Sequence, residues 1–133
     1  MALAATPSGC GSSSHAAATH GTARITVGMR DFKLTAPRRI PAGDVTLAVR
    51  NGGPDLHELI VVREGAHRSL PLRGDGLTVD EERLQSTTAA NIEPEAPGSA
   101  REVRVNLRPG RYILFCNMSG HYLGGMHTEI EVG

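Results

Sequence analysis

Apolar and polar positions alternate in several short runs between residue 23 and the end of the chain. In the stretch 23–36, Ile25, Val27 and Met29 alternate with polar or small residues, a period of two that is typical of half-buried strands. The same period recurs at residues 45–49, 103–107 and 128–132. Turn residues separate these runs, so the pattern predicts an all-β chain of many short strands, which favours a β-sandwich.

The segment 63–100 lacks this regularity. Its stretch GDGLTVDEERLQ, residues 74–85, predicts one short helix with Thr78 or Asp80 as the N-cap. The stretch IEPEAPGSA, residues 92–100, is rich in proline and glycine and predicts a loop. The segment as a whole is therefore expected to be irregular, with a short helix, and its sequence indicates no role.

Residues 1–21 form a second region without an apolar period. They are small and polar, and they predict a flexible tail or linker before one domain at 22–133. The stretch PSGCGSSS resembles a bacterial lipoprotein processing site at Cys10, although Pro7 stands where that pattern has a Leu-like residue and no full signal stretch precedes it. The alternatives are a lipid-anchored, exported protein in the periplasm or another extracytoplasmic space, and an exposed thiol in a disordered arm. We expect the first.

Composition removes other classes of function. The chain has 14 Lys and Arg residues and 14 Asp and Glu residues, so it lacks the basic surplus that phosphate binding needs. Aromatic residues make up 3% of the chain and Trp is absent, which leaves no platform for stacked bases. We therefore expect no nucleic acid partner. No apolar run approaches the length of a membrane span.

The stretch FCNMSGHYLGGM, residues 115–126, carries the candidate chemistry. The strand before it puts Tyr112, Leu114 and Cys116 on one face, so the thiol is expected at the end of a strand. His121 and Met126 follow at even spacing in a glycine-rich loop that can fold tightly over the same end. Thiolate, imidazole and thioether are soft to borderline ligands, and His₂Cys with a long axial Met is the ligand set of blue-copper sites.

That ligand set needs a second imidazole, and His57 is the natural donor. It opens the β-rich run LHELIVV directly after the turn NGGPD, and junctions of this kind lie at the ends of a sandwich. Four protein ligands would leave no open position for a substrate, so we do not expect an enzyme. Glu58 could add an oxygen ligand if it turned inward, which we do not expect with Met126 in place.

The motif CNMSGHYLGGM, with GPDLHELIVV upstream, resembles the cupredoxin (blue copper protein) family over about residues 24–133. The Cys-x₄-His-x₄-Met spacing is similar to that of auracyanins, sulfocyanins and phytocyanins. The resemblance implies that His57, Cys116, His121 and Met126 bind one copper ion. It also implies an eight-stranded Greek-key sandwich and one-electron transfer between redox proteins.

The resemblance further implies how partners dock. The histidine of the C-terminal loop, His121, would reach the surface inside an apolar patch and serve as the electron port. Tyr122 and Leu123, with Gly120 and Gly124, would form that patch. We expect the protein to be a monomer that meets its redox partners there.

Other interpretations of the same residues remain. Copper storage or delivery would use the same four ligands and is the main alternative to electron transfer. Zinc accepts Cys and His, but Met is not among its usual ligands. A catalytic Cys–His pair would leave Met126 and His57 unexplained. A copper enzyme would need a second site, but the other histidines are scattered over tail, loop and outer strand; they are His15, His20, His67 and His127.

Overall fold

The computed structural model describes residues 21–65 and 69–133. The predictions for residues 1–20, for Cys10, His15 and His20, and for His67 lie outside this range. The described residues form nine strands and one short helix. Their bounds are β1 Ala23–Arg30, β2 Lys33–Thr35, β3 Arg39–Ile40, β4 Gly43–Asn51, β5 His57–Arg63, α1 Glu81–Leu84, β6 Thr88–Glu95, β7 Ala100–Leu107, β8 Gly110–Phe115 and β9 His127–Val132.

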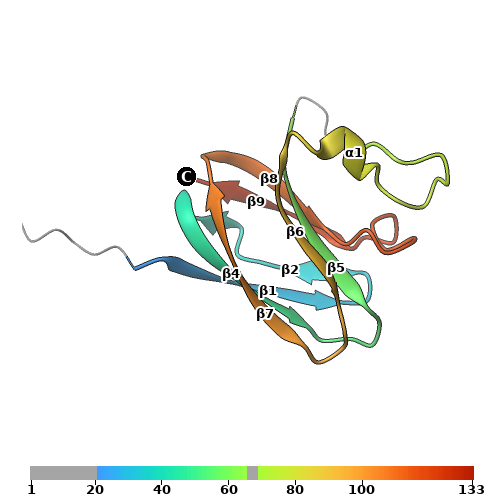
Figure 1. The fold of residues 1–133 in the computed structure, drawn as a ribbon, viewed down its shortest axis with the longest axis horizontal. Coiled ribbons are helices and arrows are strands. Elements are labelled where there is room, and N and C mark those ends of the chain that lie inside the picture. The colour runs from blue at the N-terminus through green and yellow to red at the C-terminus, as the bar shows by residue number, and fades with distance from the viewer. Residues whose placement is uncertain (1–20, 66–68) are drawn as a thin grey trace, which may run out of the picture.

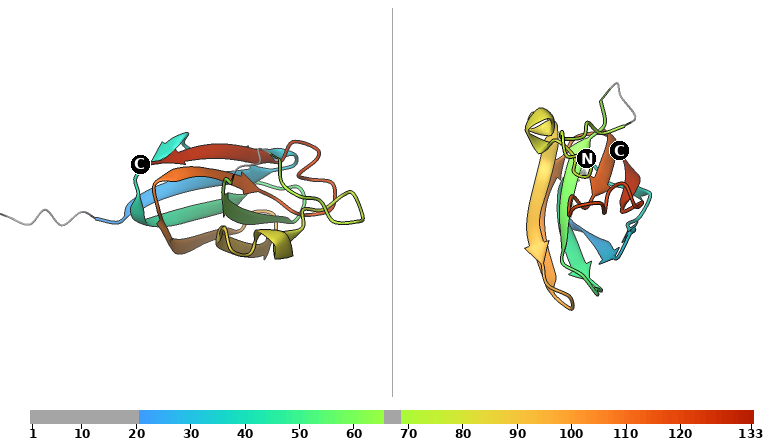
Figure 2. Two further views of the ribbon diagram at one scale, coloured as in Figure 1. Left: turned by 90° about the horizontal axis from the view of Figure 1, so that it is seen from above. Right: turned by 90° about the vertical axis from the view of Figure 1, so that its right-hand side faces the viewer.

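The strands form two sheets that pack face to face, which confirms the predicted β-sandwich (Figures 1 and 2). The four-stranded sheet has the order β2-β1-β4-β7, and the five-stranded sheet has the order β3-β9-β8-β5-β6. The pairs β1–β4 and β3–β9 are parallel, and the other pairs are antiparallel. No helix in the described ranges is long and apolar enough to span a membrane.

The alternating runs place one face of each strand in the core between the sheets. Val27, Met29, Val45 and Leu47 are at most 1% exposed, and they pack on inward residues of the facing sheet such as Leu114. Burying apolar side chains of this size stabilises the fold by about 1.5–3 kcal/mol each. We call the buried residues between the two sheets the inner core. They are Ile25, Val27, Met29, Leu34, Ile40, Val45, Leu47, Val49, Leu59, Val61, Ile92, Leu107, Tyr112, Leu114, Cys116, Met126, Ile130 and Val132.

The strands β5 and β8 are buried on both faces, whereas β1, β7 and β9 each have one largely exposed face. Their outward residues belong to a second cluster that also includes two side chains from the segment 69–84. Its members, which we call the outer cluster, are Ile60, Val62, Leu70, Val79, Ile113 and Phe115. The segment that lacked a role in the sequence therefore covers the outside of the five-stranded sheet.

The structure corrects one prediction for this segment and confirms another. Residues 92–95, predicted as loop, belong to β6, which pairs with β5 at the edge of its sheet. Pro94 is compatible with this position because an edge strand can lack a backbone N–H on its free side. The predicted helix is present as α1, and the Asp80 side chain caps it by accepting a hydrogen bond from Arg83 N.

Candidate metal centre

Two neighbouring strands bring the first pair of candidate ligands to one end of the sandwich. His57 is the first residue of β5, and Cys116 directly follows β8. The two strands are antiparallel neighbours, with Ile60 opposite Phe115, so the start of one lies beside the end of the other. Figure 1 shows the loop after β8 and the start of β5 at the end of the sandwich away from the C-terminus.

The loop 117–126 brings His121 back over the thiol. Cys116 Sγ lies 3.9 Å from His57 Nδ1 and 3.6 Å from His121 Nδ1. The three donor atoms lie within 4.8 Å of one another. A metal–sulfur bond of about 2.3 Å and a metal–nitrogen bond of about 2.0 Å, meeting at about 120°, separate S and N by about 3.7 Å. The spacing of these donors therefore fits a single metal ion.

Backbone hydrogen bonds close the loop and hold Met126 beside the other two loop residues. Cys116 N donates to Met126 O at 3.1 Å, and Met126 N donates to His121 O at 2.9 Å. Gly120 and Gly125 have φ values of 79° and 101°, a backbone conformation that suits glycine. Met126 is fully buried in the inner core together with Cys116. All four predicted ligands thus gather at one end, and their role as ligands stays a prediction.

Asn117, which sequence reasoning missed, anchors this loop to the segment 69–84. Its side chain accepts a hydrogen bond from Val79 N at 2.6 Å and donates to Val79 O at 3.0 Å. It also donates to Glu81 Oε1 at 2.7 Å. Because Asn117 follows Cys116 directly, these bonds fix the chain at the point where the thiol leaves the strand.

Burial shifts the pKa values of His57 and Cys116. His57 and Cys116 are both 0% exposed, whereas His121 is half-buried. Burial lowers the pKa of His57, opposed by its hydrogen bond to Asp31, and therefore favours the neutral imidazole that binds metals. Burial raises the pKa of the Cys116 thiol, although the backbone N–H groups of Met118 and Glu58 lower it. A metal ion would have to displace the thiol proton to bind there.

Glu58 lies on the opposite face of β5 from His57. Its carboxylate accepts a hydrogen bond from the backbone of Asn117. Burial, together with the charges of Glu81 and Glu93, raises its pKa to about 7. The cluster of metal-binding side chains in the described residues consists of His57, Cys116 and His121, without Glu58.

The surface around His121 is apolar, but its residues differ from the expected patch. Tyr122 turns inward, and its ring packs against Phe115 with the ring centroids 5.7 Å apart. Leu123 is 53% exposed, as expected. Phe32, Leu56 and Leu77, which come from three other loops, are also exposed. The Phe32 ring centroid lies 5.3 Å from that of His121, Leu56 directly precedes His57, and Leu77 O accepts a hydrogen bond from Gly120 N, so all three lie at this end. Together with Leu123, these three make up most of the large apolar side chains that are exposed in the described residues.

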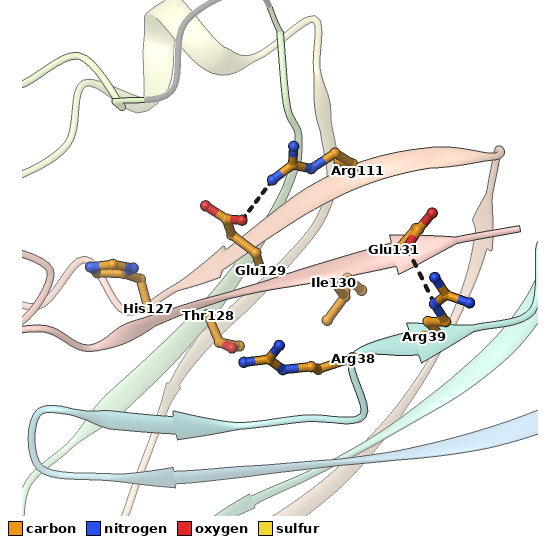
Figure 3. A pocket seen from close by; sticks show the side chains of 8 residues that line it. All are labelled: Arg38, Arg39, Arg111, His127, Thr128, Glu129, Ile130 and Glu131. Atoms are coloured by element: carbon orange, nitrogen blue, oxygen red, sulfur yellow. Dashed lines mark hydrogen bonds and ion pairs between the residues drawn. The ribbon is translucent and has the colours of Figure 1, made fainter.

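A broad hollow on the outer face of β9 lies away from the ligands (Figure 3). It has a volume of about 690 Å³, and four of the charged side chains that line it form two ion pairs. Arg39 bonds Glu131 at 3.3 Å and Arg111 bonds Glu129 at 2.8 Å. None of the residues that line the hollow belongs to the candidate centre. His127 lies at its edge, exposed as predicted.

The fold can be compared with solved structures. Auracyanin A from Chloroflexus aurantiacus, a "blue" copper protein, is 20% identical and superposes with a TM-score of 0.62, over 85% of this chain and all of that one. An auracyanin from Roseiflexus castenholzii is 17% identical, with a TM-score of 0.62 over 85% and 99% of the two chains. The chain has the cupredoxin fold. Rusticyanin from Thiobacillus ferrooxidans shares it, with 15% identity, a TM-score of 0.61 and coverage of 84% and 77%.

At these identities the structural likeness establishes the cupredoxin fold and no more. No protein-family model and no curated protein matches the sequence.

Proposed function

We propose that this cupredoxin-fold protein binds one copper ion through His57, Cys116, His121 and Met126 and carries single electrons between redox proteins. The supporting observation is the cluster of three donor atoms within 4.8 Å at one end of the sandwich. Two nitrogens and a thiolate sulfur with a nearby thioether make a donor set that suits copper better than zinc. A bound copper ion would supply a one-electron Cu(II)/Cu(I) couple.

The residues of the chain would supply rigidity and shielding. His57 and Cys116 lie at the ends of two hydrogen-bonded strands, and Asn117 fixes the start of the loop. A donor set that moves little between oxidation states keeps the cost of reorganisation low. Met126 and Cys116 are fully buried, so the inner core excludes water from the sulfur side.

His121 is the predicted exit for the electron because it is the least buried of the four residues. The exposed side chains of Phe32, Leu56, Leu77 and Leu123 lie at the same end. An apolar rim of this kind favours a short-lived contact with a redox partner. We propose that a monomer docks there, in an extracytoplasmic compartment. Attachment to a membrane through Cys10 is part of the same proposal.

The visible spectrum of the protein loaded with Cu(II) tests the proposed ligands. We expect an intense thiolate-to-copper band that Cys116→Ser abolishes. Met126→Gln should keep the band and lower the reduction potential. His127→Gln is the matched control, because it replaces an exposed histidine next to Met126 and should leave band and potential unchanged.

A colourless wild-type complex would overturn the assignment of the ligands. The rate of electron self-exchange between copies of the protein then distinguishes an electron carrier from a protein that stores or delivers copper. Fast exchange supports an electron carrier. Slow exchange with ready transfer of copper to an acceptor would indicate storage or delivery instead.

A further inference from the structure

The turn between β1 and β2 contacts both histidines of the candidate centre. Asp31 Oδ1 lies 3.0 Å from His57 Nε2. The ring of Phe32 lies next to that of His121, with the centroids 5.3 Å apart. Neither residue belongs to the motifs that predicted the ligands. This turn is more than 80 residues before the ligand loop in the sequence, yet it packs against it in the fold.

The contact between Asp31 and His57 selects one form of the imidazole. A carboxylate can only accept hydrogen bonds, so the bond at Nε2 requires the proton on that nitrogen. In a neutral ring, Nδ1 is then left with its lone pair free. Nδ1 is also the nitrogen that lies 3.9 Å from Cys116 Sγ and belongs to the donor cluster.

The position of Asp31 is itself fixed by the fold. Its Oδ1 also accepts a hydrogen bond from the backbone N–H of Asp55, at 3.3 Å, in the loop that leads into His57. Phe32 has a φ of 57°, and a Cβ on Gly124 would lie only 2.3 Å from its Cδ1 atom. The ring therefore lies directly on the ligand loop and holds the turn against it.

We propose that Asp31 is a positioning residue that keeps His57 in the Nε2–H tautomer and in the ring orientation that presents Nδ1 to the metal. The proposal rests on the proposed function only for its metal. The hydrogen bond and the tautomer are properties of the metal-free chain. Carboxylates that bind the far nitrogen of a ligand histidine fix its tautomer and raise its basicity, and their loss typically costs about 10–100-fold in metal affinity.

The test reads the tautomer without metal, by long-range ¹H–¹⁵N NMR of the histidine rings in the metal-free protein. In the wild type we expect a single Nε2–H form of His57 with a slowly exchanging ring proton. Asp31→Ala should give mixed tautomers and ring-proton exchange at least about tenfold faster. Asp31→Asn should restore the wild-type form, because an amide oxygen can accept the same bond.

Asp55→Ala is the matched control. It removes a neighbouring carboxylate that adds negative charge near His57 without bonding its ring. We expect it to leave the tautomer and the exchange rate unchanged. An effect of Asp55→Ala equal to that of Asp31→Ala would show that charge alone matters, and it would overturn the proposal.

The second measurement is the affinity for Cu(I), determined by letting the protein compete with a chelator of known affinity. Asp31→Ala should weaken binding by about 10–100-fold, whereas Asp31→Asn should weaken it less. An unchanged tautomer, exchange rate and affinity in Asp31→Ala would overturn the proposal. If the wild type bound no copper, the proposed function would fail while the NMR result would still decide the role of Asp31.

Discussion

The two sheets of the sandwich differ in what covers their outer faces. In the five-stranded sheet, β5 and β8 have outward residues that lie in the outer cluster beneath the segment 69–84. In the four-stranded sheet, β1 and β7 have outward residues that are largely exposed. His57 and Cys116 extend from the two strands that are covered on both faces. The fold therefore encloses most fully the two strands that carry His57 and Cys116.

The difference has a consequence for dynamics. A strand held between two apolar layers can shift only if both layers repack, because packed side chains leave few voids. A strand with one solvated face can adjust more easily. We therefore expect changes in the outer cluster to affect the candidate metal centre, and changes on the outer face of the four-stranded sheet to leave it unaffected.

Phe115→Ala should have the largest effect. Phe115 is 0% exposed in the outer cluster, and the variant should lower the free energy of unfolding of the metal-free protein by about 3–5 kcal/mol. The position of Cys116 should loosen as well, which broadens or weakens the thiolate–copper band. Urea unfolding followed by circular dichroism and the Cu(II) spectrum measure the two effects.

Thr46→Ala is the control for that prediction. Thr46 lies between the inward residues Val45 and Leu47 of β4, so it is on the outer face of the four-stranded sheet, and its replacement should lower the free energy of unfolding by less than about 1 kcal/mol. We expect the copper band to stay as in the wild type. Equal spectral changes in both variants would show that the outer cluster has no special influence on the position of the thiol.

Asn117→Ala should have the next largest effect. It leaves the buried N–H and C=O of Val79 without partners, which should cost about 2–3 kcal/mol. Hydrogen exchange at the Val79 amide should quicken, because the loop and the segment 69–84 separate more often. Asn106→Ala removes an exposed side-chain bond to Asp44 and should change stability by less than about 0.5 kcal/mol. Equal losses in the two variants would contradict the anchoring role of Asn117.

Gly124→Ala should have a smaller effect on stability and a local effect on His121. The new Cβ would displace the half-exposed Phe32 ring, at a cost of about 1–2 kcal/mol. NOEs between Phe32 and His121 should weaken or vanish. Gly74→Ala is the control, because a Cβ there meets no atom within 4 Å. Unchanged NOEs in Gly124→Ala would mean that the ring does not rest on the loop.

Arg24→Ala should have the smallest effect. Arg24 pairs with Glu102 on the outer face of the four-stranded sheet, and both side chains are more than half exposed. Such pairs contribute about 0–1 kcal/mol. We expect little change in stability and none in the copper spectrum. A double-mutant cycle with Glu102→Ala measures the pair, and a coupling well above this range would show that this face is more ordered than its exposure implies.

The exposure of one strand face also decided which strands could be predicted from the sequence. Strands with one solvated face, such as β1 and β9, alternate clearly and were predicted. The strand β6 was missed because its sequence, TAANIEPE, does not alternate between apolar and polar residues, and because Pro94 favours a loop. Ile113 and Phe115 could be assigned to a strand, but nothing local shows that the distant Leu70 and Val79 would cover them.

The residues of the candidate centre also differ in whether the sequence could predict them. Cys116, His121 and Met126 lie in one short segment, so their spacing, together with the glycine-rich loop and His57 upstream, predicted the site. Asp31 and Phe32 were missed because their position depends on how β1 packs in the sandwich. The turn RDFK carries no local signal that points to His57. The one available hint was Asp31 itself, a carboxylate in the turn between two strand-like runs.

The pairing of Phe115 with His127 closes the ligand loop at its base. The two ends of the loop are therefore held at the spacing of a β-ladder, whatever residues lie between them. Residues of the loop between these two ends can therefore be exchanged without changing the strands that hold them. A graft that replaces residues 118–125 but keeps Asn117 and Met126 should change the metal chemistry and lower the melting temperature less than Asn117→Ala does. Collapse of the scaffold on grafting would show that loop and sandwich fold only together.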